Sequence, residues 1–479
     1  MTGVKPLATG IAWSYGAQVL TAIAQFLYAA VTSRLIAPDG FGAYAIALVV
    51  SGLITLVANG GLGQSVARMQ ILDQSRLEGL ATYALILGFI AAVVLFFTAQ
   101  FWAGIWGDGS AAAPIKWLAI SALLAPHIGL TSGLMRRLGH FKHFAVCTFI
   151  TNIVGMVFGL VVLISTGSPV ALIAAPIIAQ LTLWLALTHM TERKLVRFGA
   201  PARARDDISF SWGVTLASVL SYTANNLGKW SVSRWVGAAA LGQWNRSDVV
   251  TAVPFYQLQT AITQVVYPEF RHDRGDTNRA KRAWPDLLIL VAWVTVPAGA
   301  VGSIILPYLV PVLFGPGWEL AASLTAALSL ICGVQVVTTV LGSAVEALGK
   351  FKWIWASQVL MIGIQIVAVA ATILRHSVWP AVIATGVLAV ARQAWYVWLC
   401  GRSGYIDVPR LLSGYLRVVA GTAYVGLLSW TLVNSIDSPI RVAAIALSAA
   451  CAVLGVLSFR DSFPPLVILR RYGIVRNDE

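Results

Sequence analysis

Polar side chains recur at steps of three and four along the apolar stretch 211–233, which reads SWGVTLASVLSYTANNLGKWSVS. At helical pitch this spacing places them on one face of an otherwise apolar helix. A lysine and two amides are costly inside hydrocarbon, so we expect Lys229, Asn225 and Asn226 to face a bundle interior or a wet cavity. An ammonium beside amides suits an anionic, hydroxyl-bearing ligand. The polar face comprises Ser211, Thr215, Ser218, Tyr222, Asn225, Lys229 and Ser233.

A second stripe of this kind runs along residues 9–34, and neighbouring apolar stretches carry shorter ones. Single Ser, Thr or Gln residues are more simply explained as hydrogen-bonded links between helices. Four or more in register on paired helices instead favour an aqueous cleft. The stripe residues are Ser14, Gln18, Thr21, Gln25, Tyr28 and Thr32; Ser51, Thr55 and Asn59; Gln257, Thr260, Gln264 and Tyr267; and Gln335, Thr339 and Glu346.

Basic residues in or beside these stretches are candidate ligands for an anionic group. Lys229, Arg246 and Arg392 are the candidates, because charge-assisted hydrogen bonds to an anion are strong. Arg34 and Arg234 lie near predicted outer helix ends, where they could bind the same ligand or reach lipid headgroups. The amides that could hydrogen-bond this ligand are Gln18, Gln25, Asn225, Asn226, Gln257 and Gln264.

Acidic residues are scarce in the apolar stretches. Asp248 and Glu346 are the candidates for binding a coupling ion or balancing Lys229. The sequence offers no paired carboxylates, nucleophile–base set, phosphate-binding glycine loop or metal-ligand spacing, so we expect no enzyme activity and no cofactor. A membrane-embedded glycosyltransferase or polymerase is a less favoured alternative, because the longest predicted outer loop, 102–113, holds one acid, Asp108.

Composition excludes a water-soluble globule. Of 479 residues, 58% are hydrophobic and 11% are charged, against roughly 25% charged in soluble domains. The net charge of +14 lies mostly in short loops between apolar spans, which indicates orientation in a membrane rather than nucleic-acid binding. The four cysteines lie in or beside apolar segments without ligand spacing, so we interpret them as packing residues.

Fourteen apolar spans of about 20 residues predict an all-α polytopic membrane protein. With the N-terminus inside, the predicted cytoplasmic loops hold most of the 33 basic residues, so both termini are expected in the cytoplasm. The first span is longer than a signal-peptide core and is expected to be retained. The spans are 9–34, 41–63, 79–101, 114–135, 143–165, 169–190, 208–235, 246–268, 286–314, 318–346, 353–374, 378–400, 412–434 and 438–458.

The chain repeats itself. Residues 33–35 and 42–44 (SRL and GAY) recur 200 residues later as SRW and GQW, and LGHFK at 138–142 recurs 210 residues later as LGKFK. Matches at equivalent places in two six-span blocks predict parallel repeats related by an axis along the membrane normal. The predicted organisation is an N-lobe at 1–190, a cytoplasmic linker at 191–207, a C-lobe at 208–400, and a C-terminal helix pair with a tail at 401–479.

On these segments the chain resembles the MOP flippase superfamily, and within it the bacterial polysaccharide transporters of the Wzx/WzxC type. The resemblance implies a MATE-like, V-shaped transporter with two six-helix lobes around a cationic cleft. Where such relatives carry an Asp after Asn-x-x in the seventh span, this chain has Lys229, which makes the cleft more positive. The matching segments are SRLIAPDGFGAYAIA at 33–47, VGAAALGQWNRSDVV at 236–250, TQVVYPEF at 263–270 and PVLFGPGWELAA at 311–322.

The resemblance also implies a function. Such proteins carry polyprenyl-diphosphate-linked oligosaccharides, the precursors of exopolysaccharide, O-antigen or related glycans, across the bacterial inner membrane by alternating access. The resemblance therefore implies that Lys229, Arg246 and Arg392 bind the diphosphate and that the six amides named above bind sugar hydroxyls. A cation-coupled exporter of drugs or small solutes with the same fold is the alternative, and it would need acids in the cleft. Beyond this glycan, the expected partners are membrane lipids and glycan synthesis or polymerisation proteins. A proton or sodium ion is left open as the coupling ion, no nucleic acid is expected, and the chain is expected to be a monomer.

Overall fold

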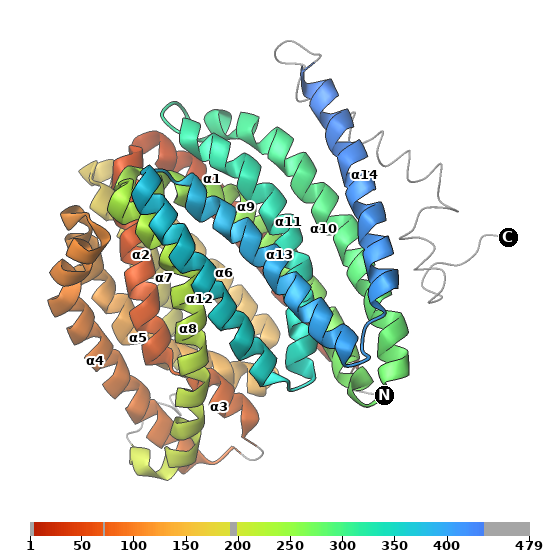
Figure 1. Ribbon diagram of the computed structural model, residues 1–479. Coiled ribbons are helices and arrows are strands. Elements are labelled where there is room, and N and C mark those ends of the chain that lie inside the picture. The colour runs from red at the N-terminus through yellow and green to blue at the C-terminus, as the bar shows by residue number, and fades with distance from the viewer. Residues whose placement is uncertain (1–3, 70–71, 192–198, 435–479) are drawn as a thin grey trace. The chain divides into compact units, whose positions relative to one another are not determined.

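The computed structural model describes residues 4–69, 72–191 and 199–434, and every regular element in these ranges is a helix (Figure 1). The all-α prediction is therefore confirmed for this part of the chain. Short 3-10 turns join some helices: η1 (Gly109–Ala111), η2 (Pro169–Ile173), η3 (Pro201–Ala204) and η4 (Asp273–Gly275). The helices are α1 (Val4–Leu35), α2 (Pro38–Asn59), α3 (Leu62–Arg68), α4 (Gln74–Trp106), α5 (Ala112–Arg137), α6 (Phe141–Thr166), α7 (Ala174–Met190), α8 (Arg205–Trp235), α9 (Ala238–His272), α10 (Thr277–Phe314), α11 (Glu319–Ala347), α12 (Phe351–Arg375), α13 (Trp379–Arg402) and α14 (Val408–Asn434).

The predicted spans from 9–34 to 412–434 each fall on a long helix, and the predicted span 438–458 lies outside the described residues. Span 41–63 is interrupted: α2 ends at Asn59, Gly60 and Gly61 are left-handed, and α3 begins at Leu62. Within the described ranges, ten helices are long and apolar enough to cross a membrane. The long helices outside those ten are α1, α8 and α9, and these are the helices on which the sequence predicts extended polar stripes.

The described helices form two compact units. The first comprises Met1–Arg246 with Val367–Ala381, and the second comprises Ser247–Ile366 with Val382–Glu479. The predicted lobe boundaries at 190 and 208 stay predictions. In the first unit, α4 packs on α5 and α6 packs on α7, with glycine against backbone at both crossings: Gly88 lies on Leu123 and Gly155 on Ala175. Lipid tails are as apolar as hydrophobic side chains, so the hydrophobic effect does not drive membrane helices together. Close van der Waals contacts between small residues stabilise their packing instead.

In the second unit, α10 lies between two partners, α11 and α14 (Figure 1). A Cβ on Gly299 would lie 2.7 Å from the carbonyl oxygen of Ser329. The backbones of α10 and α11 are therefore in close contact at this point. At the start of α14, Arg410 forms an ion pair of 2.7 Å with the buried carboxylate of Asp286 on α10. Because Asp286 is 4% exposed, this pair fixes one end of α14 to α10.

The repeated LGxFK sequences form the same turn. Each follows the end of a helix, α5 or α11, and each glycine is left-handed, with φ of +77° at Gly139 and +71° at Gly349. In both turns the leucine N–H donates to the carbonyl oxygen four residues back, at 2.9 and 3.0 Å. A left-handed residue just past a helix is the usual place for glycine, because a Cβ there would be strained. The sequence match at an offset of 210 is thus also a match in local structure.

The starts of α2 and α9 contact each other through glycine, with both contacts inside the first unit. A Cβ on Gly42 would overlap the carbonyl oxygen of Ala238, and a Cβ on Gly242 would overlap that of Pro38. The offset of 200 that relates the SRL and SRW segments carries Pro38 to position 238 and Gly42 to position 242. The two contacts are therefore the same contact with the partners exchanged, which is the pattern of a local two-fold axis.

A buried cation lies beside this contact between α2 and α9. The guanidinium carbon of Arg246 lies 3.7 Å from the ring centroid of Phe41, and the two residues are 4% and 0% exposed. The Nε of Arg246 has no hydrogen-bond partner. A desolvated cation over an aromatic face is stabilised by the ring quadrupole. The sequence assigns Arg246 to ligand binding, whereas in this structure its side chain is packed on Phe41, one turn from the glycine contact.

We predict that Gly42→Ala destabilises the protein by about 1–3 kcal/mol, because the added methyl must displace the backbone of α9. Thermal unfolding of the purified protein in detergent measures this. The matched control is Gly104→Ala on α4, where a Cβ meets nothing within 4 Å. The control should be neutral or stabilising by about 0.5–1 kcal/mol. Equal midpoints for the two variants would contradict the close contact.

We also predict that Phe41 and Arg246 are energetically coupled. A double-mutant cycle of Phe41→Leu and Arg246→Met should give a coupling of about 2 kcal/mol in the unfolding free energy. The control cycle uses Phe96→Leu and Lys116→Met, an exposed pair with the ammonium 5.8 Å from the ring centroid. That pair should couple by about 0.5 kcal/mol. Additive effects at Phe41 and Arg246 would show that the stacking contributes nothing.

Candidate functional site

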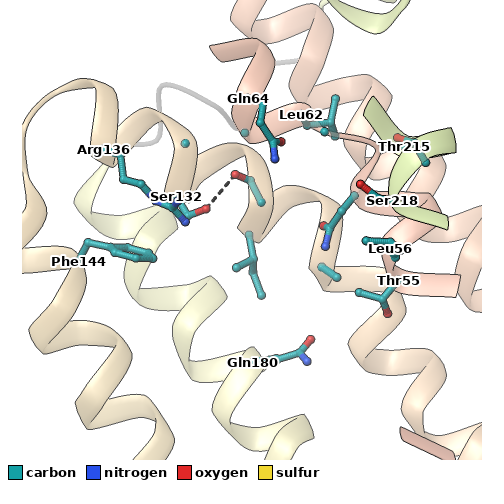
Figure 2. Close-up of a pocket in the computed structure, with 17 residues that line it drawn as sticks. Thr55, Leu56, Leu62, Gln64, Ser132, Arg136, Phe144, Gln180, Thr215 and Ser218 are labelled. Carbon is teal, nitrogen blue, oxygen red and sulfur yellow. Dashed lines mark hydrogen bonds between the residues drawn. The ribbon is translucent and has the colours of Figure 1, made fainter. Parts of the chain in front are cut away.

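A pocket of about 600 Å³ with a mixed polar and apolar lining lies within the first unit (Figure 2). Six helices supply its wall: α2, α3, α5, α6, α7 and α8. This volume is within the range of ligand sites, about 300–1,000 Å³. The residues with polar side chains that line it are Thr55, Asn59, Gln64, Ser132, Arg136, Gln180, Thr215 and Ser218.

Glycines shape the wall of this pocket. The left-handed Gly60 and Gly61 end α2 and turn the chain into α3, which then lies against α5. At that crossing a Cβ on Gly63 would lie 2.9 Å from the carbonyl oxygen of Gly129, and one on Gly133 would lie 2.6 Å from the Cα of Gly63. Side chains at these positions would separate α3 from α5, so the glycines are required for this wall.

Hydrogen bonds hold the start of α8 against α3 and α4. The hydroxyls of Ser65 and Ser211 lie 2.6 Å apart, and Ser65 also donates to the backbone carbonyl of Asp207 at 3.0 Å. The carboxylate of Asp207 accepts from the Nε of Arg76 on α4 at 3.0 Å. These contacts fix the register of α8, and Thr215 and Ser218 thereby reach the pocket.

The charge of the pocket wall is positive. Among the described residues that line it, Arg136 is the one with an ionised side chain, and none of them is a carboxylate. The Arg136 guanidinium carbon lies 5.4 Å from the ring centroid of Phe144, which also lines the pocket. A cationic ligand would find no opposite charge in this wall, whereas a neutral or anionic ligand would not need one.

Two side-chain amides of the pocket have unused acceptors. Asn59 Oδ1 and Gln180 Oε1 are buried and have no hydrogen-bond partner. The hydroxyls of Ser132 and Thr215 instead donate to backbone carbonyl oxygens, those of Gly129 at 2.9 Å and Ser211 at 2.8 Å. A buried amide oxygen without a donor costs free energy. A ligand rich in hydroxyl groups, or ordered water, would satisfy both amides.

The predicted ligands on α8 lie outside this pocket. Lys229 is half-buried and Asn225 is exposed. Asn226 donates its amide to the carbonyl of Tyr222 at 2.9 Å, and both line a separate apolar pocket of about 190 Å³. Trp102, Trp106 and Trp230 also line that smaller pocket.

The other predicted residues are distributed over both units. Arg392, on α13 in the second unit, donates from Nη1 to the sulfur of Met361 at 3.8 Å and lies 5.9 Å from the ring centroid of Tyr396. Arg34 is exposed, and Arg234 is exposed with its side chain against Gly107. The remaining half-buried residues are Gln18, Gln25, Gln257 and Asp248, and the remaining exposed ones are Gln264 and Glu346.

The pocket thus contains members of the predicted stripes but none of the predicted ligands. Thr55, Asn59, Thr215 and Ser218 belong to the stripes. The sequence analysis gives neither Arg136 nor Gln180 a role in binding. Arg136 falls between the predicted spans 114–135 and 143–165, among the basic residues of the loops, and Gln180 is a single amide in its span. A sequence signal existed for Gln180, since an amide in an apolar span is costly unless it faces a partner or water.

Comparison with known proteins places the chain in a family. The family described as "Polysaccharide biosynthesis protein" matches residues 31–323. The chain is similar to the lipopolysaccharide biosynthesis protein WzxC of Escherichia coli K12, with 24% identity over 336 residues, which are 69% of this chain and 67% of WzxC.

Solved structures share the fold. The lipid II flippase MurJ in an inward closed conformation superposes with a TM-score of 0.74 at 11% identity, over 95% of this chain and 99% of MurJ. A MATE protein in complex with MaD3S superposes with a TM-score of 0.54 at 17% identity, over 88% of this chain and 99% of that one. The match of the family model over more than half of the chain shows that the chain belongs to the polysaccharide biosynthesis protein family, and the chain is similar to WzxC.

Proposed function

We propose that the protein moves a polyprenyl-diphosphate-linked oligosaccharide from the inner to the outer leaflet of the bacterial inner membrane. Membership of the polysaccharide biosynthesis family carries this proposal, together with similarity to WzxC and a fold shared with a lipid II flippase. The positively charged polar pocket in the first unit suits such a substrate, because its wall offers amides, hydroxyls and one guanidinium but no carboxylate.

The physical problem is the head group. A diphosphate with sugars cannot enter hydrocarbon unaided, because each desolvated charge and each unpaired hydroxyl raises its free energy by several kcal/mol or more. Helices with polar faces replace water as the hydrogen-bonding partner, while the prenyl chain stays in lipid. The polar faces of α1, α8 and α9 would provide such surfaces. Lys229, Arg246 and Arg392 remain the proposed diphosphate ligands, and Arg246 would have to leave its contact with Phe41 to reach a ligand.

The proposed mechanism is alternating access between two six-helix lobes, 1–190 and 208–400, with both termini in the cytoplasm. The exchanged contacts of Gly42 and Gly242 and the matching LGxFK turns support a duplicated, parallel arrangement. The α2–α9 crossing would close one side of the membrane, and its backbone contact would separate when that side opens. Asp248 and Glu346 remain the candidates for binding a coupling ion.

A cation-coupled exporter of drugs or small solutes is the rival function, since MATE proteins share the fold. The absence of a carboxylate among the residues lining the 600 Å³ pocket argues against a cationic substrate. Flipping of a polyprenyl-linked oligosaccharide and transport of an organic cation, compared in the same proteoliposomes, distinguish the two functions. Transport of the cation alone would reject the proposal.

We predict that Lys229→Ala abolishes glycan flipping, because the diphosphate loses a charge-assisted hydrogen bond on the polar face of α8. The loss should be at least tenfold in the initial rate of flipping in proteoliposomes, with an unchanged unfolding midpoint. The matched control is Lys281→Ala, at an exposed position near the start of α10. Full transport by the Lys229 variant would remove this residue from the mechanism.

A further inference from the structure

We infer that the 600 Å³ pocket of the first unit is a subsite for one sugar unit of the transported glycan, with an anionic group of the substrate bound by Arg136. The inference rests on the proposed function and specifies where the head group is recognised. It assigns roles to Asn59, Gln180 and Arg136 that the sequence does not predict.

The unused acceptors define the chemistry of the ligand. Asn59 Oδ1, from α2, and Gln180 Oε1, from α7, are buried in the wall of the same pocket without a hydrogen bond. Figure 2 shows Gln180 in this wall. Each of these amide oxygens can accept a hydrogen bond from an O–H or N–H group of a ligand. A sugar presents several hydroxyl donors at different angles, so it is a class of ligand that can donate to amides on different helices. An apolar prenyl chain carries no donor and would leave both oxygens unsatisfied.

An alternative explanation is that the polar side chains of the pocket only link neighbouring helices. Their hydrogen bonds would then run from one helix to the next, with little space between the helices. Here the hydroxyls of Ser132 and Thr215 bond within their own helices, and the amide oxygens of Asn59 and Gln180 bond to nothing. The arrangement therefore fits a ligand better than a helix link.

The positive charge of Arg136 further restricts the kind of substrate that fits the pocket. Arg136 is exposed, so its guanidinium can meet a ligand that enters the pocket, and Phe144 beneath it supports the side chain. Leu56, Ile128 and Phe144 give the wall apolar area for the C–H faces of a sugar ring. The anion at Arg136 is a sugar carboxylate or a phosphate of the carrier, since both accept two hydrogen bonds from a guanidinium.

The test uses the full protein in proteoliposomes with two probes: an undecaprenyl-diphosphate disaccharide ending in glucuronic acid, and the same lipid ending in glucose. The double variant Asn59→Leu with Gln180→Leu should flip both probes about tenfold more slowly than the wild type. The reason is that each substitution removes from the pocket one acceptor for a sugar hydroxyl. Asn152→Leu is the control: this amide on α6 donates to the Thr148 carbonyl of its own helix at 2.7 Å and does not line the pocket. It should match the wild type.

Arg136→Gln separates the two sources of the anion. Slower flipping of the glucuronic acid probe alone identifies the sugar carboxylate, and slower flipping of both probes identifies the diphosphate. Wild-type rates for the double amide variant would overturn the inference while leaving the proposed function intact. A wild-type protein that flips neither probe would instead reject the proposed function.

A crosslinking measurement covers the case in which the amide variants do not fold. A photoreactive p-benzoylphenylalanine replaces Ile128, which lines the pocket on α5. We expect crosslinking to the disaccharide-bearing lipids at least fivefold above that to undecaprenyl diphosphate without sugar. Equal labelling of the three lipids would show that the sugar does not enter the pocket and would overturn the inference.

Discussion

A polar group inside a membrane must find a partner or water, because hydrocarbon offers no hydrogen bonds. Much of this structure follows from that constraint. Hydroxyls on the helices bond back to their own backbone, as Thr21 does to Ala17 and Thr32 does to Tyr28. Longer side chains cannot all do so, and several buried amide oxygens stay unsatisfied, among them those of Asn59 and Gln180. The places where the constraint is not met inside the protein are therefore the places where a polar substrate would be stabilised.

The same environment explains why glycine decides how the helices meet. Apolar side chains gain little by leaving lipid for protein, so van der Waals contact at close range supplies the stability. The crossings of α4 with α5, α6 with α7 and α10 with α11 each bring a glycine against a backbone. At the starts of α2 and α9 the two glycines are related by the internal repeat, so one small interface uses both copies of the motif.

The charge of the site agrees with an anionic glycan lipid. The sequence predicts a cationic cleft around Lys229, Arg246 and Arg392, and these residues keep that role as a proposal. The structure adds a second polar region with Arg136 at its wall and no carboxylate among its lining residues. A long substrate head needs several subsites, so a pocket for one sugar and separate basic residues for the diphosphate are compatible parts of one pathway.

The sequence by itself predicted the helical class, a series of apolar spans and the positions of the polar stripes, because span length and a period of 3.6 are local properties of the chain. In the part of the chain that the structure describes, ten helices are long and apolar enough to cross a membrane. It also located Thr55, Asn59, Thr215 and Ser218 on stripes that reach the pocket. Only the tertiary structure decided that Arg136 and Gln180 join them, that α2 breaks at Gly60 and Gly61, and that Arg246 packs on Phe41. The local sequence of a helix in lipid does not fix its rotation about its own axis or its neighbours. Backbone contacts between residues far apart in the sequence determine both.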